Sequence, residues 1–329
     1  MERERARQWR SAGVSWAGGV PGLRWEPGAG SGGAGPVGGP VSPLSYGPVA
    51  GGGGNAYGRG IGFRVVGERR CVGVRGNPCP YAAAVAGRAT QAQCADCARL
   101  DRSRSVAADT MADDPRPYAV YLAWFGPGMV KVGITREDRG PARLLEQGAV
   151  TFSWLGRGPL MAARRCEELL RAGLGVPDRI SYAKKRAVRA ALPVAEKRAA
   201  EVRELHARAV GLTGWPEALG VVGCEVVDHA GVFGLEGPAG LAGAADVVGV
   251  VRELVSGGSV AGRVVAVAGP DLHLEVVGAG AVGAAGVVVV DSRLLAGWRL
   301  ERGDVGGGVT VPVKGVEKER ETGVQEGLF

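Results

Sequence analysis

Aromatic side chains and histidines are scarce in this sequence. Aromatic residues make up 5% of the 329 positions, and the 3 histidines, at positions 206, 229 and 273, are too scattered to pair at metal-ligand spacing. Glycine is abundant instead, with 58 residues, so the 46% hydrophobic content comes mainly from valine, alanine and leucine. Such a chain has few large side chains to anchor a core, and we expect parts of it to be loosely ordered.

Long apolar runs are also missing. The longest uncharged and mainly apolar run, 276–290, is short for a membrane span and is rich in glycine and alanine. The first residues, MERERARQWR, carry charges with no apolar segment behind them, unlike a secretory signal. We therefore expect a cytoplasmic protein without a membrane partner. The sequence also contains no GK[ST] phosphate-binding loop.

Lysine is rare beside arginine. The net charge of +7 and the pI near 9.3 arise from 34 arginines and only 6 lysines. Arginine is well suited to bidentate phosphate contacts, which favours a nucleic-acid partner. A GC-rich genome would enrich arginine, glycine, alanine and valine equally well, so the net charge is weak support for that partner.

The pattern predicts an α/β (α+β) protein in which a small mixed sheet with flanking helices follows a cysteine-rich segment and precedes a small β-rich unit. Short pieces near the start, 22–25 and 61–66, have the composition of strands. We divide the chain into a mostly disordered Gly/Pro-rich segment at 1–58, a four-cysteine segment at 59–112, a core with a basic helical extension at 113–210, a β-rich domain at 211–313 and a charged tail at 314–329.

The core segment has the clearest pattern. Residues 120–135, VYLAWFGPGMVKVGIT, predict two strands joined by a Gly-Pro-Gly turn. A helix follows, with Pro141 at its start and Gly148 just past its end. After another strand, 160–174 predicts a second helix with an apolar stripe at helical spacing.

Four cysteines cluster before the core, at spacings of seven, fourteen and two intervening residues: Cys71, Cys79, Cys94 and Cys97. The CxxC turn can present two thiolates to one tetrahedral ion, and a second pair can complete the site, so we predict structural zinc. The spacing of seven is wider than usual. A redox-active CxxC and unpaired buried thiols are the alternatives.

Three other features receive structural interpretations. Cys166 and Cys224 stand alone in apolar patterns and are predicted to be core residues. A GxGxxG formed by Gly278, Gly280 and Gly283 leaves no room for a helix before the next valine run, so we interpret it as a glycine turn between strands.

Four residues of the core carry the types needed for phosphodiester chemistry. Tyr121 and Lys131 fall on neighbouring strands, where the hydroxyl and the ammonium could meet across the pair. Arg143 lies in the first turn of the helix that follows. On the later helix, Glu167 flanks the apolar stripe and points toward the sheet, whereas Glu168 lies opposite it. A carboxylate at the edge of a buried stripe needs a cation, which could be a metal, an arginine or Lys131.

These residues resemble the GIY-YIG nuclease superfamily. AVY at 119–121 stands where that family has its GIY strand, and KVG at 131–133 stands where it has YIG, followed by a helix arginine and a later helix glutamate. Together with the upstream cysteines, the pattern VYLA, KVGITR and EQGA is similar to that of a bacterial family of unknown function, which looks like a divergent branch of the superfamily. The resemblance covers residues 64–195.

The resemblance implies that Tyr121 and Arg143 are catalytic and that Glu167 holds a single Mg²⁺ or Mn²⁺. Lys131 departs from the family pattern, because it replaces the second tyrosine that would position or activate water. A lysine can bind phosphate as a point charge, or act as a base if burial or neighbouring charge lowers its pKa.

The helical segment 184–210, which Pro193 should kink or split, opens with four basic residues: Lys184, Lys185, Arg186 and Arg189. They could follow a nucleic-acid backbone, or form a solvated basic face.

Three hypotheses follow from these patterns. The first is a zinc-containing, metal-dependent nuclease. The second is a module that binds DNA or RNA without cleaving it, with Lys131 and Arg143 as phosphate contacts. The third is a protein-interaction scaffold in which Glu167 forms a salt bridge.

Overall fold

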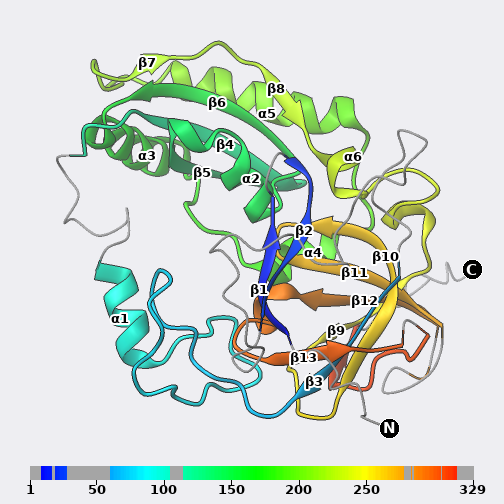
Figure 1. Ribbon diagram of the computed structural model, residues 1–329. Helices are drawn as coiled ribbons and strands as arrows, with labels where there is room; N and C mark the ends of the chain where they lie inside the picture. The colour runs from blue at the N-terminus through cyan, green and yellow to red at the C-terminus, as the bar shows by residue number, and fades with distance from the viewer. Residues whose placement is uncertain are drawn as a thin grey trace, which may run out of the picture.

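The computed structural model describes residues 9–16, 19–27, 60–103, 114–277, 283, 285–304 and 306–316. Within these residues, the strands form one sheet of five and one of nine strands, with helices packed mainly around the smaller sheet (Figure 1). The fold is therefore mixed α+β, as the sequence predicts.

The five-stranded sheet is antiparallel, in the order β5-β4-β6-β7, with β8 also paired to β6. Its strands are β4 (Tyr118–Gly126), β5 (Met129–Arg136), β6 (Thr151–Gly158), β7 (Gly220–Val221) and β8 (Val226–Asp228). The last two lie in the segment 211–313 that the sequence assigned to a separate β-rich domain. That predicted boundary at 210 does not coincide with a boundary between the sheets, because β7 and β8 return to pair with β6.

The helices follow the predicted pattern closely. Pro141 precedes α2, and Gly148 ends it with a φ of 69°, a left-handed conformation that suits glycine. Pro193 falls between α4 and α5, which confirms the predicted break. The helices between residues 137 and 233 are η3 (Glu137–Arg139), α2 (Ala142–Gln147), α3 (Leu160–Leu174), α4 (Tyr182–Val188), α5 (Ala195–Val210) and α6 (Ala230–Phe233).

The two faces of β4 pack against different helices. Val120 and Leu122 share a buried cluster with the apolar side of α3. Tyr121 and Ala123 face the opposite way, toward α2. In the register of β4 and β5, Tyr121 lies opposite Gly133 and Ala123 opposite Lys131, so Tyr121 and Lys131 are diagonal neighbours on one face.

The nine-stranded sheet combines strands from both ends of the described chain, in the order β14-β9-β12-β11-β10-β3-β13-β1-β2. All of its pairings are antiparallel except that of β12 with β9. The strands are β1 (Trp9–Ser15), β2 (Gly22–Pro27), β3 (Gly60–Val66), β9 (Val247–Val251), β10 (Ser259–Ala268), β11 (Asp271–Val276), β12 (Gly286–Asp291), β13 (Arg299–Arg302) and β14 (Val313–Gly315). Part of the predicted disordered segment 1–58 is thus built into this sheet, because β1 pairs with β13.

β2 and β3 contain the strands predicted at 22–25 and 61–66. The connection between β11 and β12 joins two antiparallel neighbours. Most of the predicted GxGxxG turn, including Gly278 and Gly280, lies outside the described residues.

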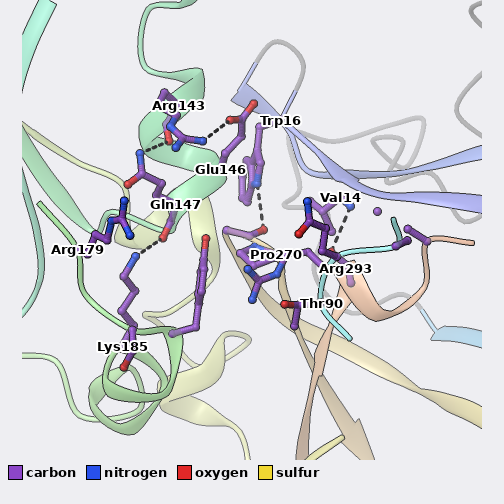
Figure 2. Close-up of a pocket in the computed structure, with 18 of the residues that line it drawn as sticks. Val14, Trp16, Thr90, Arg143, Glu146, Gln147, Arg179, Lys185, Pro270 and Arg293 are labelled. Atoms are coloured by element: carbon purple, nitrogen blue, oxygen red, sulfur yellow. Dashed lines mark hydrogen bonds and ion pairs between the residues drawn. The ribbon is translucent and has the colours of Figure 1, made fainter. Parts of the chain in front are cut away.

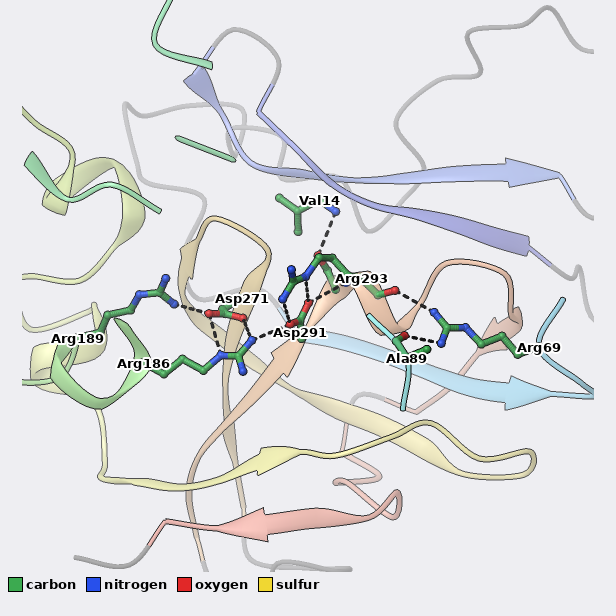
Figure 3. A network of polar contacts seen from close by, with 9 residues as sticks. Val14, Arg69, Ala89, Arg186, Arg189, Asp271, Asp291 and Arg293 are labelled. Carbon is green, nitrogen blue, oxygen red and sulfur yellow. Dashed lines mark hydrogen bonds and ion pairs between the residues drawn. The ribbon is translucent and has the colours of Figure 1, made fainter. Parts of the chain in front are cut away.

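The cysteine segment is fastened to the larger sheet by the buried guanidinium of Arg69, which donates only to backbone carbonyls (Figure 3). Its Nε bonds to Ala296 at 2.8 Å, and its Nη1 bonds to Ala86 at 2.7 Å and Ala89 at 2.6 Å. Burial lowers the pKa of Arg69 to about 10. The segment ends in α1 (Ala95–Ser103), after which 104–113 lie outside the described residues.

An ionic network joins α4 to the larger sheet (Figure 3). Arg186 bonds to Asp271 at 2.6 and 3.0 Å and to Asp291 at 2.7 Å. Arg189 reaches Asp271 at 2.5 Å, and Arg293 reaches Asp291 at 2.6 Å. Burial alone would raise the pKa of the fully enclosed Asp271, but the two α4 arginines outweigh burial and hold that pKa below its ordinary value.

We predict that Asp271→Ala costs about 3–5 kcal/mol of unfolding free energy, because it leaves the buried Arg189 without its carboxylate. Urea denaturation followed by circular dichroism measures the change. The matched control is Glu275→Ala, which removes a half-exposed partner of Arg263 and should cost about 0–1 kcal/mol. Equal small losses in both variants would show that the network does not hold the two sheets together.

Candidate functional site

A cleft of about 970 Å³ lies where the cysteine segment and the two sheets meet. One wall carries Arg143 and Gln147 from α2 and Lys185 from α4, and the opposite wall carries Trp16 and Arg293 (Figure 2). Residues 90–93 of the cysteine segment also line the cleft. The cleft is thus built from parts of the chain that are far apart in sequence.

Cations outnumber anions in the lining. The basic residues are Lys131, Arg143, Arg179, Lys185 and Arg293, and the acidic ones are Asp101, Glu146 and Asp178. Each of these acids already lies within 3.6 Å of an arginine. Arg293 is itself paired with Asp291 at 2.6 Å, whereas Arg143 makes only a longer contact of 3.7 Å with Glu146, which already bonds to Arg139 at 2.6 Å. The two lysines and Arg143 are therefore the cations best placed to face a ligand.

Tyr121 lies behind the lining of the cleft, with 1% of its surface exposed. Its hydroxyl accepts a hydrogen bond from Gln147 Nε2 at 2.9 Å, while Lys131 Nζ stands 5.8 Å from the ring centroid. The predicted meeting of hydroxyl and ammonium is therefore replaced by a cation–π contact. Burial raises the pKa of Tyr121. Gly133 is required here, because a Cβ at that position would lie 2.4 Å from the tyrosine oxygen.

Lys131 is 9% exposed and donates to the backbone carbonyl of Asp178 at 3.2 Å. Its pKa falls to about 8, first because of burial and then because of the nearby positive charge of Arg143. The negative charge of Glu167 acts in the opposite direction. A lysine with this pKa is partly neutral just above pH 7, which is the condition for it to act as a base.

Glu167 is half-buried on α3, and burial followed by the neighbouring Asp178 raises its pKa. Glu168 is exposed and pairs with Arg171. The geometry thus distinguishes the two acids in the way the helical pattern predicts. Neither Glu167 nor Tyr121 lines the cleft itself. The charge of Glu167 raises the pKa of Lys131, and the charge of Arg143 lowers the pKa of Tyr121, so both are electrostatically linked to residues of the cleft.

The predicted nucleic-acid-binding set on α4 requires a correction. Only Lys184 is exposed. Arg186 and Arg189 pair with Asp271, and Lys185 is 3% exposed. The set is neither a phosphate-tracking surface nor a solvated basic face, because α4 and the residue after it lie between the two sheets, where Lys185 and Arg189 are buried and Arg186 is paired.

Lys185 belongs to the cleft instead. Its Nζ lies 3.7 Å from the ring centroid of Phe125 and 4.6 Å from that of Tyr182, and it donates to the carbonyl of Gln147 at 3.1 Å. Burial, followed by the charge of Lys131, lowers its pKa to about 7. The sequence grouped Lys185 with its basic neighbours, since only the packing of α4 separates its inward side chain from theirs.

Gln147 is a site residue that sequence reasoning missed. It is 7% exposed and joins the walls of the site, since its side chain bonds to Tyr121 and its carbonyl accepts from Lys185. Its place in the last turn of a helix, just before a glycine, gave no sign of this role.

The four cysteines before the core come together at a second site. The Sγ atoms of Cys71, Cys79, Cys94 and Cys97 all lie within 4.8 Å of one another. A tetrahedral zinc with bonds of about 2.3 Å places its sulfur ligands about 3.8 Å apart, and Cys79 and Cys94 are separated by 3.9 Å. The cluster can therefore hold a metal ion such as zinc. The same separation is far too long for a disulfide.

A tight turn explains the wide spacing of the first pair. Val74 and Asn77 form a β-bridge around Arg75 and Gly76, whose φ angles are 49° and 86°. Gly73 is needed beside them, because a Cβ there would lie 1.9 Å from the carbonyl oxygen of Asn77. The turn folds the seven intervening residues back and brings the thiols of the first pair together.

Hydrogen bonds favour thiolates in the cluster. The N–H of Ala83 lowers the pKa of Cys79 to about 7, and the N–H of Cys94 donates to Cys71 Sγ at 3.2 Å. Burial raises the pKa of Cys97. Although α1 begins within the CxxC, the segment before it is not a strand, so the thioredoxin-like context required by the redox alternative is not found there.

The two remaining cysteines differ from each other. Cys166 is fully buried on α3, as predicted, but Cys224 is exposed. The prediction of a core position for Cys224 is wrong because it lies in the exposed connection between β7 and β8, where its apolar neighbours do not form a buried stripe.

The fold and these two sites define a mixed α+β protein with a four-cysteine cluster and a cation-lined cleft. The chain belongs to the family described as "protein of unknown function (DUF2797)", whose model matches residues 58–300. The matched range includes all four clustered cysteines and most of the cleft. No curated protein and no solved structure gave a match to the chain. None of the described helices is long and apolar enough to cross a membrane.

We predict one zinc per chain in protein purified without chelator, measured by elemental analysis. Cys94→Ser should lose most of the metal, because it removes one of four ligands. Cys224→Ser, outside the cluster, should keep it. Absence of stoichiometric metal from the unmodified protein, or equal metal in both variants, would contradict the site.

We predict that Lys185→Met stabilises the protein by about 1–3 kcal/mol near pH 6, because the charged amine no longer has to be buried. The pKa of this lysine is about 7 in the folded protein and about 10.4 in an unfolded chain, so the unfolded chain binds more protons between these values. The burial cost is present in full below pH 7 and disappears as the pH rises toward 10.4.

Urea denaturation at several pH values in phosphate-free buffer tests this expectation. The advantage of the variant over the unmodified protein should shrink from pH 6 to pH 10. A constant difference in unfolding free energy across that range would show that Lys185 titrates normally.

Proposed function

We propose that this protein is a metal-dependent nucleic-acid phosphodiesterase whose five-stranded sheet is a divergent GIY-YIG-like unit. One observation carries the proposal. The four residues selected for this chemistry come from β4, β5, α2 and α3, and the charges of Arg143 and Glu167 act on both Tyr121 and Lys131 beside a cationic cleft. Titratable residues from four separate elements that influence one another beside a cleft are typical of a functional site.

The residues suit distinct roles. Arg143, 46% exposed at the cleft, would stabilise negative charge on a phosphate. Glu167, with Asp178 nearby, offers carboxylate oxygens of the kind that Mg²⁺ or Mn²⁺ prefers, and such an ion supplies an activated water when bound. Lys131 stands at the position of the second tyrosine, where it would contact the phosphate or accept a proton.

The cysteine cluster serves this function as a structural zinc site. Val72 bonds to the carbonyl of Ala92 at 2.9 Å, and Gln93 Nε2 bonds to the carbonyl of Gly73 at 2.8 Å. A metal held by the adjacent thiols would therefore fix the wall of the cleft at 90–93. We infer a cytoplasmic setting, in which thiols remain reduced and available as ligands.

A second candidate is a nucleic-acid-binding module that does not cleave. The enclosure of Tyr121 favours it, because a hydroxyl that is bonded to Gln147 and almost fully buried does not reach a substrate in the present conformation. In this version Arg143 and Lys131 bind the phosphate backbone, and Glu167 only balances their charge.

The proposed activity predicts cleavage when purified protein is incubated with labelled single-stranded, duplex and branched DNA and RNA in the presence of Mg²⁺ or Mn²⁺. Glu167→Gln and Arg143→Ala should each lower the rate by about 100-fold or more, since each removes a group that stabilises the transition state. The lysine variant Lys131→Met should lose activity as well.

Glu168→Gln is the matched control, because it alters the adjacent exposed acid on the same helix and should leave the rate unchanged. Cleavage that survives in Glu167→Gln would overturn the assignment of the metal ligand. Salt-sensitive binding without cleavage, weakened by Lys131→Met or Arg143→Ala, would establish the binding module instead.

A further inference from the structure

The two lysines of the cleft are buried, and no carboxylate among the described residues pairs with them. An ammonium has three donors. The hydrogen bonds of the described residues use one donor of Lys131, on the carbonyl of Asp178, and one of Lys185, on the carbonyl of Gln147. Neither amine forms an ion pair with a described carboxylate, although their exposed fractions are only 9% and 3%.

The two amines and Arg143 also act on one another. Lys131 is the strongest charge influence on Lys185, and Arg143 is the strongest on Lys131. Like charges held together in a half-buried cleft are unfavourable unless an anion joins them. All three residues line the same cleft, and Figure 2 shows Arg143 and Lys185 on one side of it. We therefore expect their unused donors to reach one ligand.

We propose that Lys131, Arg143 and Lys185 form a pocket for a phosphate monoester, such as the terminal phosphate of a nucleotide or of a nucleic-acid strand. A monoester carries a charge of about −1.5 to −2 at pH 7 and three acceptor oxygens, which suits three cations better than the single charge of a phosphodiester. The cleft of about 970 Å³ has room for a whole nucleotide behind that phosphate. The inference rests on the proposed function in one respect, because it takes nucleic acid as one source of the phosphate.

Lys185 is the residue that distinguishes binding of a terminal phosphate from phosphodiester cleavage. The aromatic rings of Phe125 and Tyr182 hold its amine at 3.7 and 4.6 Å, away from bulk water. It has no counterpart in the cleavage set of Tyr121, Lys131, Arg143 and Glu167. A role in holding the terminal phosphate would therefore give the protein a preference for phosphorylated ends that phosphodiester cleavage alone does not require.

Binding measured without divalent metal tests the pocket. The ligands are inorganic phosphate, adenosine 5′-monophosphate, and one oligonucleotide prepared with a 5′-phosphate, with a 3′-phosphate and with no terminal phosphate. We expect phosphate and one of the phosphorylated forms to bind, and the preferred form identifies the source. Lys185→Gln should weaken this binding about tenfold or more, because it removes a charged hydrogen bond.

Lys197→Gln is the control, since this lysine is exposed on α5, away from the cleft. It should bind phosphate as the unmodified protein does. Circular dichroism establishes that Lys185→Gln is folded, and Arg143→Gln, at a half-exposed position, provides a second test if it is not. Equal affinity for the oligonucleotide with and without a terminal phosphate would overturn the proposal, as would unchanged phosphate binding in both variants.

The outcome is independent of cleavage, because Glu167→Gln retains all three cations. If no substrate is cut but this variant still prefers phosphorylated ends, the pocket stands and the phosphodiesterase proposal fails. If cleavage occurs with no such preference, the phosphodiesterase stands and the pocket fails.

Discussion

The buried carboxylate of Asp271 is the constraint on which the arrangement of the molecule depends. It has no exposed surface, and Arg186 and Arg189 of α4 both bond to it. A charge so enclosed is tolerated only with close partners, so the position of α4 between the two sheets is fixed by its arginines. Lys185, one residue before Arg186, is thereby turned toward the smaller sheet and the cleft.

The shape of the cleft depends on this contact between α4 and the larger sheet. β5 supplies Lys131, α2 supplies Arg143, the turn after β12 supplies Arg293, and the cysteine segment contributes residues 90–93. Arg69 joins that segment to the larger sheet, since its guanidinium bonds to two carbonyls within the segment and to the carbonyls of Arg293 and Ala296 beside the sheet. A metal in the cysteine cluster would act at the same boundary, so both features stabilise the shape of the cleft from outside it.

Charge in the cleft is arranged unevenly. Carboxylates near its surface are matched by arginines, while the partners of the two lysines in the described part of the chain are carbonyl oxygens and aromatic rings. Burial of unpaired amines lowers their pKa values and costs stability in the absence of a ligand. Binding sites commonly carry such costs, because a ligand of opposite charge then recovers them.

Hydrogen bonds beneath the cleft connect Tyr121 to the helices beside it. The Tyr121 hydroxyl is bonded to Gln147, whose own carbonyl holds Lys185. These two contacts connect β4, α2 and α4 into one unit beneath the cleft. Any catalytic use of Tyr121 would require this unit to open, whereas phosphate binding by the lysines would not.

The sequence by itself determined the local structure of the core. Periodicity and the turn residues predicted β4, β5, α2 and α3, and the helical pattern separated Glu167 from Glu168, because these features depend on near neighbours in the chain. The spacing of the cysteines was enough to predict a metal-binding cluster. The resemblance of the core to a nuclease also rested on local motifs.

Only the tertiary structure decided what the basic residues do. Lys184, Lys185, Arg186 and Arg189 look alike in sequence, yet one is exposed, two neutralise Asp271 and one enters the cleft. The pairing of β1 with β13 and of β8 with β6 likewise joins distant segments across the predicted domain boundaries. Partners far apart in the chain leave no periodic signal, because burial and charge pairing depend on how the sheets and helices pack together.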